Sequence, residues 1–433
     1  MDSSEIPIFP NLKDTISKIK EDFTFEKQYN TLIDYDAISP TDPDFFFIKN
    51  LLNNTKPDTF AFFSPKESKG IGCFLGLVIG DALGNLTDGF PLDNNRNLIT
   101  SFENYIDTPR IPLGLYSDDS AMALCIADSL LSTNYQYDAS DIKHRFLLWW
   151  YEGLNNGKAL VKADPKFYKA KMPLDFNSFG IGTTIWCSLL TFIKNPNKPQ
   201  VSSKDSFMPK NSDGNGSIMR LAPIVLAFND NFEKMTEISR DQSFLTHHGE
   251  EAAECCQLLA NILSILLNEE TKNLTYLEEK KPFFLYVCKK ALMQADLKLS
   301  SVICLAQSQQ EEEWEEDDHN SCEEDLNWNW MDQNFNYSKT RIDKNPTCIG
   351  VYCMDCLAMA LHITLYSKDF KEAILKSVNI GGDSDTLAAV VGQIAGCFYG
   401  ISDFMLNQYQ IVRKWDQDKT FIRAYKLINH KKL

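Results

Sequence analysis

Glycine recurs at every fourth position from Gly72 to Gly84, in the segment GCFLGLVIGDALG. All other residues of this segment are apolar except Asp81, which predicts a buried helix. Residues four positions apart lie on one face of an α-helix, so the glycines form a stripe without side chains. A second helix can approach such a stripe closely, although glycine is unfavourable inside a helix. The segment therefore predicts a close helix pair, and the buried Asp81 requires a polar partner such as a backbone amide.

Amphipathic helices follow along the chain, whereas clear alternating strands are scarce. One apolar face comprises Ile185, Trp186, Leu189, Leu190 and Ile193, and another comprises Ala252, Cys256, Leu259, Leu263 and Leu266. Residues 282–306 and 350–377 also have helical periodicity. A chain of 433 residues with 44% hydrophobic residues can bury a large core. We therefore predict an all-α fold, a compact orthogonal bundle of many helices.

Three segments depart from the helical pattern, two at the ends of the chain and one inside it, and they predict how the domain is bounded. Residues 1–66 mix short apolar patches with turn signals, which indicates an N-terminal extension before a domain at 67–402. Residues 403–433 end in basic side chains and predict a solvated C-terminal tail. Residues 308–346 are acidic, rich in Asn and Trp, and without periodicity. This composition predicts an acidic insertion loop that the domain tolerates losing, although its tryptophans suggest a docking role.

Charge and cysteine usage limit the compartment and the partners. The net charge of −16 argues against a nucleic-acid partner, but ten of the acidic residues lie within 311–325. No apolar run is long enough to span a bilayer, and the N-terminus lacks the pattern of a signal peptide. Twelve cysteines without a signal peptide indicate reduced thiols, and Cys353-x-x-Cys356 has no second half for a zinc site. We expect a cytoplasmic monomer that binds neither nucleic acid nor a membrane.

Two acidic clusters stand where apolar helical runs begin. One is GGDSDT at Gly381–Thr386, and the other is SDDS at Ser117–Ser120. Carboxylates and hydroxyls are the ligands of hard divalent cations, and paired carboxylates repel one another unless a cation lies between them. The alternative is that one Asp caps each helix while the other is solvated. If the two clusters meet in space, the metal interpretation is favoured.

The two clusters together resemble the metal-binding signatures of the ADP-ribosylglycohydrolase family, the DraG-like hydrolases. The resemblance covers roughly residues 66–402, with five motifs in the family's order. It implies two Mg²⁺ ions, with Mn²⁺ as a possible substitute. The implied metal ligands are Ser117, Asp118, Asp119, Asp383, Asp385 and Thr386.

Further motifs resemble the family's substrate-binding segments. Gly214, Asn215, Gly216 and Ser217 begin a Gly-Asn-Gly-x-x-Met-Arg stretch, which the resemblance places in the ADP-ribose pocket. By itself Asn-Gly predicts only a turn, although its amides could hold phosphate oxygens. The Arg220 that ends this stretch suits either a phosphate or a structural salt bridge.

Two aromatic side chains complete the implied substrate site. The resemblance places His247 near the ribose phosphate, although a histidine is more often a packed or exposed residue. Phe179 lies in a loop that resembles one near the adenosine, and it suits either base stacking or core packing.

The implied reaction is cleavage of the glycosidic bond of an ADP-ribosylated protein side chain or a small ADP-ribose conjugate. Asp88, Asp118 and Asp385 are the implied catalytic residues. Asp88 is a departure, because most relatives carry the longer Glu there. This departure keeps open an alternative, a catalytically weak ADP-ribose-binding regulatory module.

A second alternative is a phosphatase of the haloacid-dehalogenase type, since Asp383–Thr386 fits Asp-x-Asp-x-Thr. Such an enzyme needs a β-branched strand immediately before its nucleophilic Asp. Here the preceding LKSVNI segment is too polar for a buried strand, and no parallel sheet is predicted.

Overall fold

The computed structural model describes residues 14–15, 17–18, 43–53, 63–93, 99–104, 112–156, 178–269, 277–311, 327–416 and 418–430. These ranges contain sixteen α-helices and one 3-10 turn, and β-pairing within them is limited to isolated bridges. The predicted all-α fold class is confirmed. No described helix has the length and apolar character needed to cross a membrane.

The helices follow one another along the chain, and the connections between them range from a few residues to more than thirty. They are α3 (Pro43–Asn53), α4 (Pro65–Gly84), α5 (Asp118–Ser132), α6 (Ala139–Glu152), α7 (Thr183–Lys194), α8 (Ala222–Phe228), α9 (Phe232–Ser243), α10 (Glu250–Asn268), α11 (Leu277–Gln294), α12 (Ser300–Gln307), α13 (Lys339–Lys344), α14 (Cys353–Leu365), α15 (Phe370–Asn379), α16 (Ser384–Tyr399), α17 (Asp403–Asp416) and α18 (Lys419–Asn429), with the 3-10 turn η4 at Asn215–Ser217.

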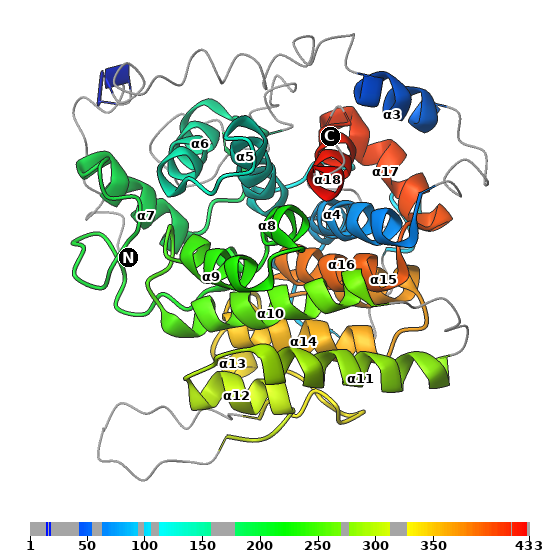
Figure 1. Ribbon diagram of the computed structural model, residues 1–433. Helices are drawn as coiled ribbons and strands as arrows, with labels where there is room; N and C mark the ends of the chain where they lie inside the picture. The colour runs from blue at the N-terminus through cyan, green and yellow to red at the C-terminus, as the bar shows by residue number, and fades with distance from the viewer. Residues whose placement is uncertain are drawn as a thin grey trace, which may run out of the picture.

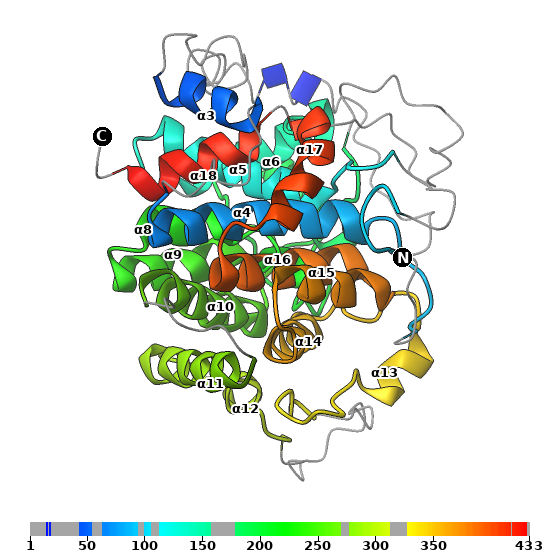
Figure 2. The same cartoon turned by 90° about the vertical axis from the view of Figure 1, so that its right-hand side faces the viewer.

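Helices α4 and α16 lie side by side at the centre of the molecule, with α17 and α18 on one side and α10 and α14 on the other (Figures 1 and 2). Helix α4 starts at a capping box, in which Ser64 accepts from the amide of Glu67 while the Glu67 carboxylate accepts from the amide of Ser64. From Lys69 to Gly84 every residue of α4 is buried. The centre of the fold is therefore a helix covered on all sides.

The glycine stripe of α4 faces a matching small-residue stripe on α16. A Cβ atom on Gly76 would lie 2.1 Å from the carbonyl oxygen of Gly392, and one on Gly80 would lie 2.0 Å from that of Ala388. The two backbones are thus in direct contact, which confirms the predicted close helix pair. Gly72 faces Gly396 at the other end, so the helices are antiparallel. This direction places the end of α4 beside the start of α16.

The chain beyond residue 402 is part of the domain, not a solvated tail. Helices α17 and α18 both pack against α4 (Figure 2). Tyr409 and Phe421 are fully buried, and Arg423 donates to Asp128 at 2.5 Å in a buried ion pair. At the other end of the chain, α3 packs against α18 and buries Ile48. The expected boundaries of the extension and the tail are therefore corrected, because apolar faces in both segments complete the core.

The second half of the expected insertion loop also belongs to the core. Trp328 and Trp330 are 1% and 0% exposed, and the Trp330 indole donates to the carbonyl oxygen of Leu305 at 2.7 Å. Arg341 of α13 makes two hydrogen bonds to Asp355, at 2.9 and 2.7 Å. From this packing we now expect 327–346 to be required for the fold, which departs from the expectation for 308–346 as a whole. Most of the acidic run, 312–326, lies outside the described residues.

We expect Trp330→Ala to destabilise the protein by about 3–5 kcal/mol, because it leaves a large cavity in the core. Urea unfolding followed by circular dichroism measures this loss. The control is Met293→Ala on α11, where the side chain is 78% exposed, and it should change stability by less than about 0.5 kcal/mol. Equal midpoints for the Trp330 variant and the wild type would show that this segment is not part of the core.

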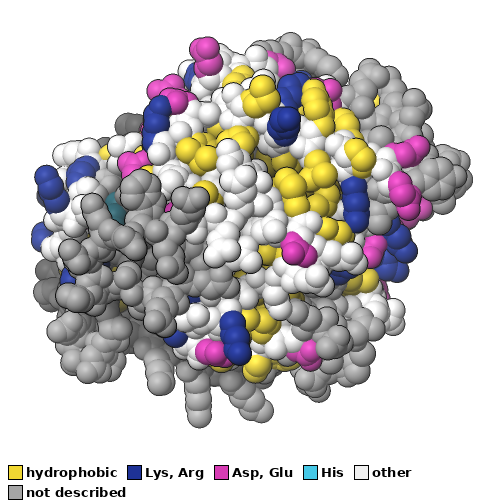
Figure 3. Space-filling view, turned by 90° about the horizontal axis from the view of Figure 1, so that it is seen from below, with side chains coloured by type: hydrophobic (Ala, Val, Ile, Leu, Met, Phe, Trp, Pro, Cys, Tyr) yellow, Lys and Arg dark blue, Asp and Glu magenta, His cyan; other side chains and the backbone are white. Residues whose placement is uncertain are grey.

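Charged side chains are mixed on the face seen from below. Lys and Arg lie among Asp and Glu, and the hydrophobic side chains gather in the upper and right-hand part of this view (Figure 3). Among the described residues visible there, the net negative charge is not gathered into one acidic surface. Cys353 and Cys356 are both fully buried, in line with packed thiols.

Candidate metal centre

Three chain segments bring six aspartates to one end of the central helix pair. Helix α4 and the turn after it supply Asp81 and Asp88, and the first turn of α5 supplies Asp118 and Asp119. The start of α16 supplies Asp383 and Asp385. Because α4 and α16 are antiparallel and in backbone contact, these segments meet. The predicted convergence of the two acidic clusters is therefore observed.

Asp81 holds the start of α5 in place from another helix. Its carboxylate accepts from the amides of Ser117 and Ser120, at 2.8 and 2.9 Å. Both serine hydroxyls also donate to it, at 2.9 and 2.5 Å, as does the Asn85 side chain at 2.8 Å. Asp81 thus satisfies amides that a helix N-terminus otherwise leaves unpaired. The expectation of backbone amide partners for Asp81 is confirmed.

The turn before α16 requires glycine. Gly381 and Gly382 have φ of +86° and +67°, a conformation that side chains disfavour. A Cβ atom on Gly382 would also lie 2.5 Å from the carbonyl oxygen of Ile349. Gly382 exchanges backbone hydrogen bonds with Gly89 and Phe90, at 2.9 and 2.8 Å. This pairing holds the turn after α4, which carries Asp88, against the start of α16.

The aspartates form two groups that could each hold a cation. Asp81, Asp119 and Asp385 are one group, and Asp88, Asp383 and Asp385 are the other. Within each group one oxygen of each carboxylate lies within 4.8 Å of the corresponding oxygens of the other two. Asp385 belongs to both groups, as expected for a ligand between two neighbouring ions. Asp119 Oδ1 is buried without a hydrogen-bond partner among the described residues, which leaves it available to a cation.

Burial and mutual repulsion act on these carboxylates together. Burial, and then the neighbouring aspartates, raise the pKa values of Asp118, Asp119 and Asp385 well above the ordinary range. Burial also raises the pKa of Asp383, although hydrogen bonds from Asn215 and Thr386 oppose this. A divalent cation would relieve the repulsion and favour the charged forms. The all-oxygen donor set and the unpartnered Asp119 oxygen fit such a cation.

Helix capping does not account for the two clusters. Asp383 is the N-cap of α16 and Ser117 is the N-cap of α5, yet in the described structure neither side chain caps its own helix. Asp383 instead follows the end of α15, so no strand precedes it. This helix is inconsistent with the phosphatase alternative.

The sequence comparison decides the family. The model of the ADP-ribosylglycohydrolase family matches residues 64–427. The chain belongs to the ADP-ribosylglycohydrolase family. The match runs into α18, in agreement with the packing of the C-terminal helices on α4.

Curated relatives and a solved structure are similar to this ADP-ribosylglycohydrolase family member over most of its length. ADP-ribosylarginine hydrolase Tri1 from Pseudomonas putida is 27% identical over 334 residues, which are 76% of this chain and 70% of that protein. Human ADP-ribosylhydrolase ARH3 is 25% identical over 361 residues, which are 80% and 87% of the two chains. A solved ADP-ribosylglycohydrolase-related protein complex superposes with a TM-score of 0.56 at 23% identity, covering 84% of this chain and all of that one. This structural likeness shows the fold.

The expected metal ligands of this family member differ in their hydrogen bonds and in whether they belong to a three-carboxylate group. Ser117 Oγ is 2.9 Å from both Asp81 Oδ1 and Asp119 Oδ2, and the Thr386 amide donates to Asp385 at 2.9 Å. Asp118 is buried beside them but belongs to neither three-carboxylate group. Asp81, which the motif comparison did not include among the ligands, belongs to one of them. Its signal in the sequence was an acidic residue inside an otherwise apolar helix.

The family's Gly-Asn-Gly segment reaches the metal centre through a side chain. Asn215 Nδ2 donates to Asp383 Oδ2 at 2.6 Å and to the carbonyl oxygen of Gly350 at 2.9 Å. Ser217 is fully buried, and its hydroxyl accepts from Ser243 at 2.9 Å. These two side chains therefore bond within the protein, and a ligand on this segment would meet its backbone.

The two remaining substrate candidates are His247, which lies beside this segment, and Phe179, which lies in a loop elsewhere in the chain. His247 is 2% exposed and packs behind the glycines, with Cε1 2.9 Å from the position of a Cβ atom on Gly216. Phe179 is half-buried, in a loop that lies against the start of α5. There a Cβ atom on Gly180 would be 2.8 Å from Asp118 Oδ1.

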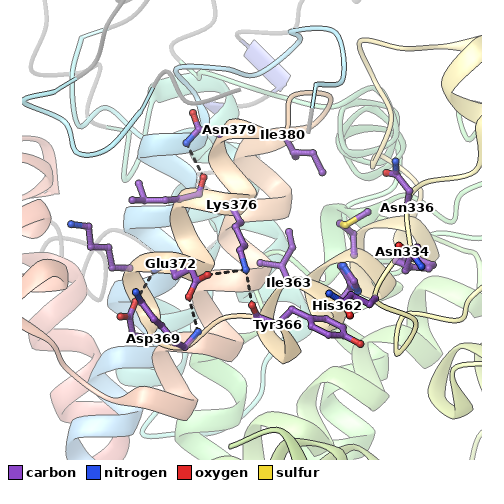
Figure 4. Close-up of a pocket in the computed structure, with 16 residues that line it drawn as sticks. Asn334, Asn336, His362, Ile363, Tyr366, Asp369, Glu372, Lys376, Asn379 and Ile380 are labelled. Carbon is purple, nitrogen blue, oxygen red and sulfur yellow. Dashed lines mark hydrogen bonds and ion pairs between the residues drawn. The ribbon is translucent and has the colours of Figure 1, made fainter. Parts of the chain in front are cut away.

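A separate cavity of about 950 Å³ lies between α14, α15 and residues 333–336 (Figure 4). It contains none of the six aspartates. Its end at Asn379 and Ile380 is close in sequence to Gly381, but two of its charged side chains, Glu372 and Lys376, form an ion pair with each other. Lys376 is 3.0 Å from Glu372 and donates to the carbonyl oxygen of Tyr366 at 2.6 Å. The chemistry of the acidic centre therefore makes it the better candidate for the active site.

Proposed function

We propose that the protein is a hydrolase that cleaves the glycosidic bond between ADP-ribose and a protein side chain or a small conjugate. The observation that carries this proposal is the shared Asp385 between two three-carboxylate groups, in a chain of this family. The names of the relatives support hydrolysis of ADP-ribose conjugates. We further propose, from the sequence, that it acts as a cytoplasmic monomer.

The proposed cofactor is a pair of Mg²⁺ ions, with Mn²⁺ as a substitute. The ligands would be the carboxylates of both groups, together with Asp118 and the hydroxyls of Ser117 and Thr386. Bound ions would supply Lewis-acid polarisation and an activated water. Asp81 has a supporting role in this scheme, because five hydrogen bonds already engage its carboxylate.

The protein's own groups would orient the substrate and stabilise charge. Backbone amides of 214–217 would hold the diphosphate, and Phe179 would stack on the adenine, which reduces the freedom of the bound substrate. The anionic centre favours the positive charge that develops at the anomeric carbon. Asp88, which is exposed at the edge of the outer group, would orient or protonate the leaving group.

The alternative, a catalytically weak ADP-ribose-binding module, rests on Asp88 alone. This carboxylate is one methylene shorter than the Glu of most relatives, so it reaches less far towards a substrate. A turnover assay with Mg²⁺ bound separates the two functions. A panel of Arg-, Ser- and O-acetyl-linked ADP-ribose substrates identifies the acceptor, and binding without turnover of any of them would favour the module.

We expect ADP-ribose to raise the thermal stability, and to raise it more with Mg²⁺ present, because the proposed phosphate and metal sites are adjacent. At about 100 times its dissociation constant the ligand should add about 2.7 kcal/mol. Differential scanning fluorimetry with and without EDTA measures this shift, and adenosine, which lacks the diphosphate, is the control. No shift with ADP-ribose and Mg²⁺ together would contradict both the enzyme and the binding module.

A further inference from the structure

Arg220 is a buried cation without a carboxylate partner among the described residues. It is 0% exposed, and its guanidinium lies 4.8 Å from the ring centroid of Phe146. Its Nε and Nη2 donate to the side chain and backbone of Gln242, at 2.9 and 3.0 Å. Arg220 makes no salt bridge among the described residues, and it lies too deep to reach a phosphate. Neither the structural salt bridge nor the phosphate contact expected from the sequence is therefore found.

Arg220 also donates to the sulfur of Met122, at 3.8 Å, and to a threonine beside His247. Its Nη2 donates to Thr246 Oγ1 at 2.8 Å, and that oxygen is 2.8 Å from His247 Nδ1. Thr246 is 0% exposed. Its own hydroxyl proton has one acceptor among the described residues, which is His247 Nδ1. If Nδ1 carried a proton instead, the buried hydroxyl would be left without an acceptor.

The opposite ring nitrogen of His247 faces the Gly-Asn-Gly segment. Nε2 lies 3.3 Å from the position of a Cβ atom on Gly214 and equally far from one on Gly216. Within the described residues Nε2 has no hydrogen-bond partner, although His247 is 2% exposed. Burial lowers the pKa of His247 well below the ordinary range, and the charges of Arg220, Lys143 and His248 lower it further. Both effects favour the neutral form of the ring.

We propose that Arg220 and Thr246 are positioning residues that hold His247 in its Nε2–H tautomer, so that this N–H donates to a diphosphate oxygen on the 214–217 segment. Arg220 occupies an acceptor position of the Thr246 oxygen, and this directs the threonine proton to Nδ1. The absence of side chains at Gly214 and Gly216 leaves the path to the ligand open. This inference rests on the proposed binding of ADP-ribose, but the tautomer itself does not.

Lys143 supports the same segment from behind. Its buried ammonium donates to the carbonyl oxygen of Leu245, the residue before Thr246, and to Ser188 Oγ at 3.1 Å. Lys143 thus fixes the backbone that carries the threonine and the histidine. Among the described residues Lys143 makes no hydrogen bond to the His247 ring, so the orientation of the proton depends on Thr246.

The test compares Thr246→Val, which keeps the shape but loses the hydroxyl, with the conservative Thr246→Ser. Long-range ¹H–¹⁵N correlation spectra of histidine-labelled protein report the tautomer, and six histidines make assignment by His247→Gln practical. We expect the Nε2–H tautomer in the wild type and in Thr246→Ser, and its loss in Thr246→Val. Titration calorimetry should then show the ADP-ribose dissociation constant raised about tenfold in Thr246→Val and largely retained in Thr246→Ser.

Kinetics with a hydrolysable substrate add a readout that a structural defect alone would not produce. A lost contact to the diphosphate should raise KM by about the same factor while kcat changes less. A wild-type Nδ1–H tautomer or an imidazolium at neutral pH would overturn the proposal, as would equal ADP-ribose affinity in Thr246→Val and wild type. If the wild type bound no ADP-ribose at all, the proposed function would fail, whereas the spectra would still decide whether Thr246 sets the tautomer.

Discussion

Replacing Asp385 with Asn is expected to abolish hydrolysis and to weaken divalent metal binding by at least about 100-fold. Asp385 is the one aspartate common to both carboxylate groups, so the change removes a ligand from each. Asn keeps the shape of the side chain but removes one negative charge. Because burial and repulsion raise the pKa of Asp385, the metal-free variant should be no less stable than the wild type. Titration calorimetry with Mg²⁺ and Mn²⁺, together with thermal unfolding in EDTA, measures both effects.

The matched control for this change is Asp403→Asn. Asp403 also lies in the first turn of a helix, α17, but it is exposed and follows the last turn of α16, whereas Asp385 lies in the first turn of α16. It should leave metal binding and turnover unchanged. Equal binding heats for wild type and Asp385→Asn, or no heat in either, would contradict the metal centre and the mechanism built on it.

Gly80→Ala is expected to destabilise the fold by about 3 kcal/mol or more. The new methyl carbon would be fixed directly to the backbone of α4. It would lie 2.0 Å from the carbonyl oxygen of Ala388, which belongs to the backbone of α16. Only separation of α4 and α16 can relieve this overlap, since no side chain can rotate away. The same separation would move Asp81 from Asp385, so metal affinity should fall as well. Urea unfolding and Mg²⁺ titration measure the two losses.

Gly182→Ala provides the control for the glycine substitution. A Cβ atom at Gly182 has no other atom within 4 Å, and its φ of −74° suits any residue. Stability should change by less than about 0.5 kcal/mol. If Gly80→Ala unfolded at the same urea concentration as Gly182→Ala, the backbone contact between α4 and α16 would not be as close as described.

Much of the helix pattern followed from short-range features of the sequence. The apolar periodicity predicted helices that the structure places at α4, α7, α10 and α16. The spacing of the glycines predicted a close helix contact, but it did not identify α16 as the partner. That assignment required a second stripe of small residues, at Ala388, Gly392 and Gly396, which reads as an ordinary helix when taken alone.

The expectations that failed depended on distant contacts. Residues 327–346 lack periodicity, yet Trp328 and Trp330 are buried because α12 and α14 supply a surface for them. The basic end of the chain suggested a solvated tail, whereas α17 and α18 pack their apolar faces against α4. In both cases the composition of the segment was known, but the surface it meets was not.

The sequence by itself determined the helices, the glycine stripe and the two acidic clusters, because helical hydrogen bonds and apolar periodicity join residues a few positions apart. The family resemblance added the expectation that the clusters hold metal ions. Only the tertiary structure decided that Asp81 joins Asp119 and Asp385, and that Asn215 bonds to Asp383. Asp81 and Ser117 are 36 positions apart, and Asn215 and Asp383 are 168 apart. Contacts over such separations depend on how whole helices pack, and no local pattern specifies that packing.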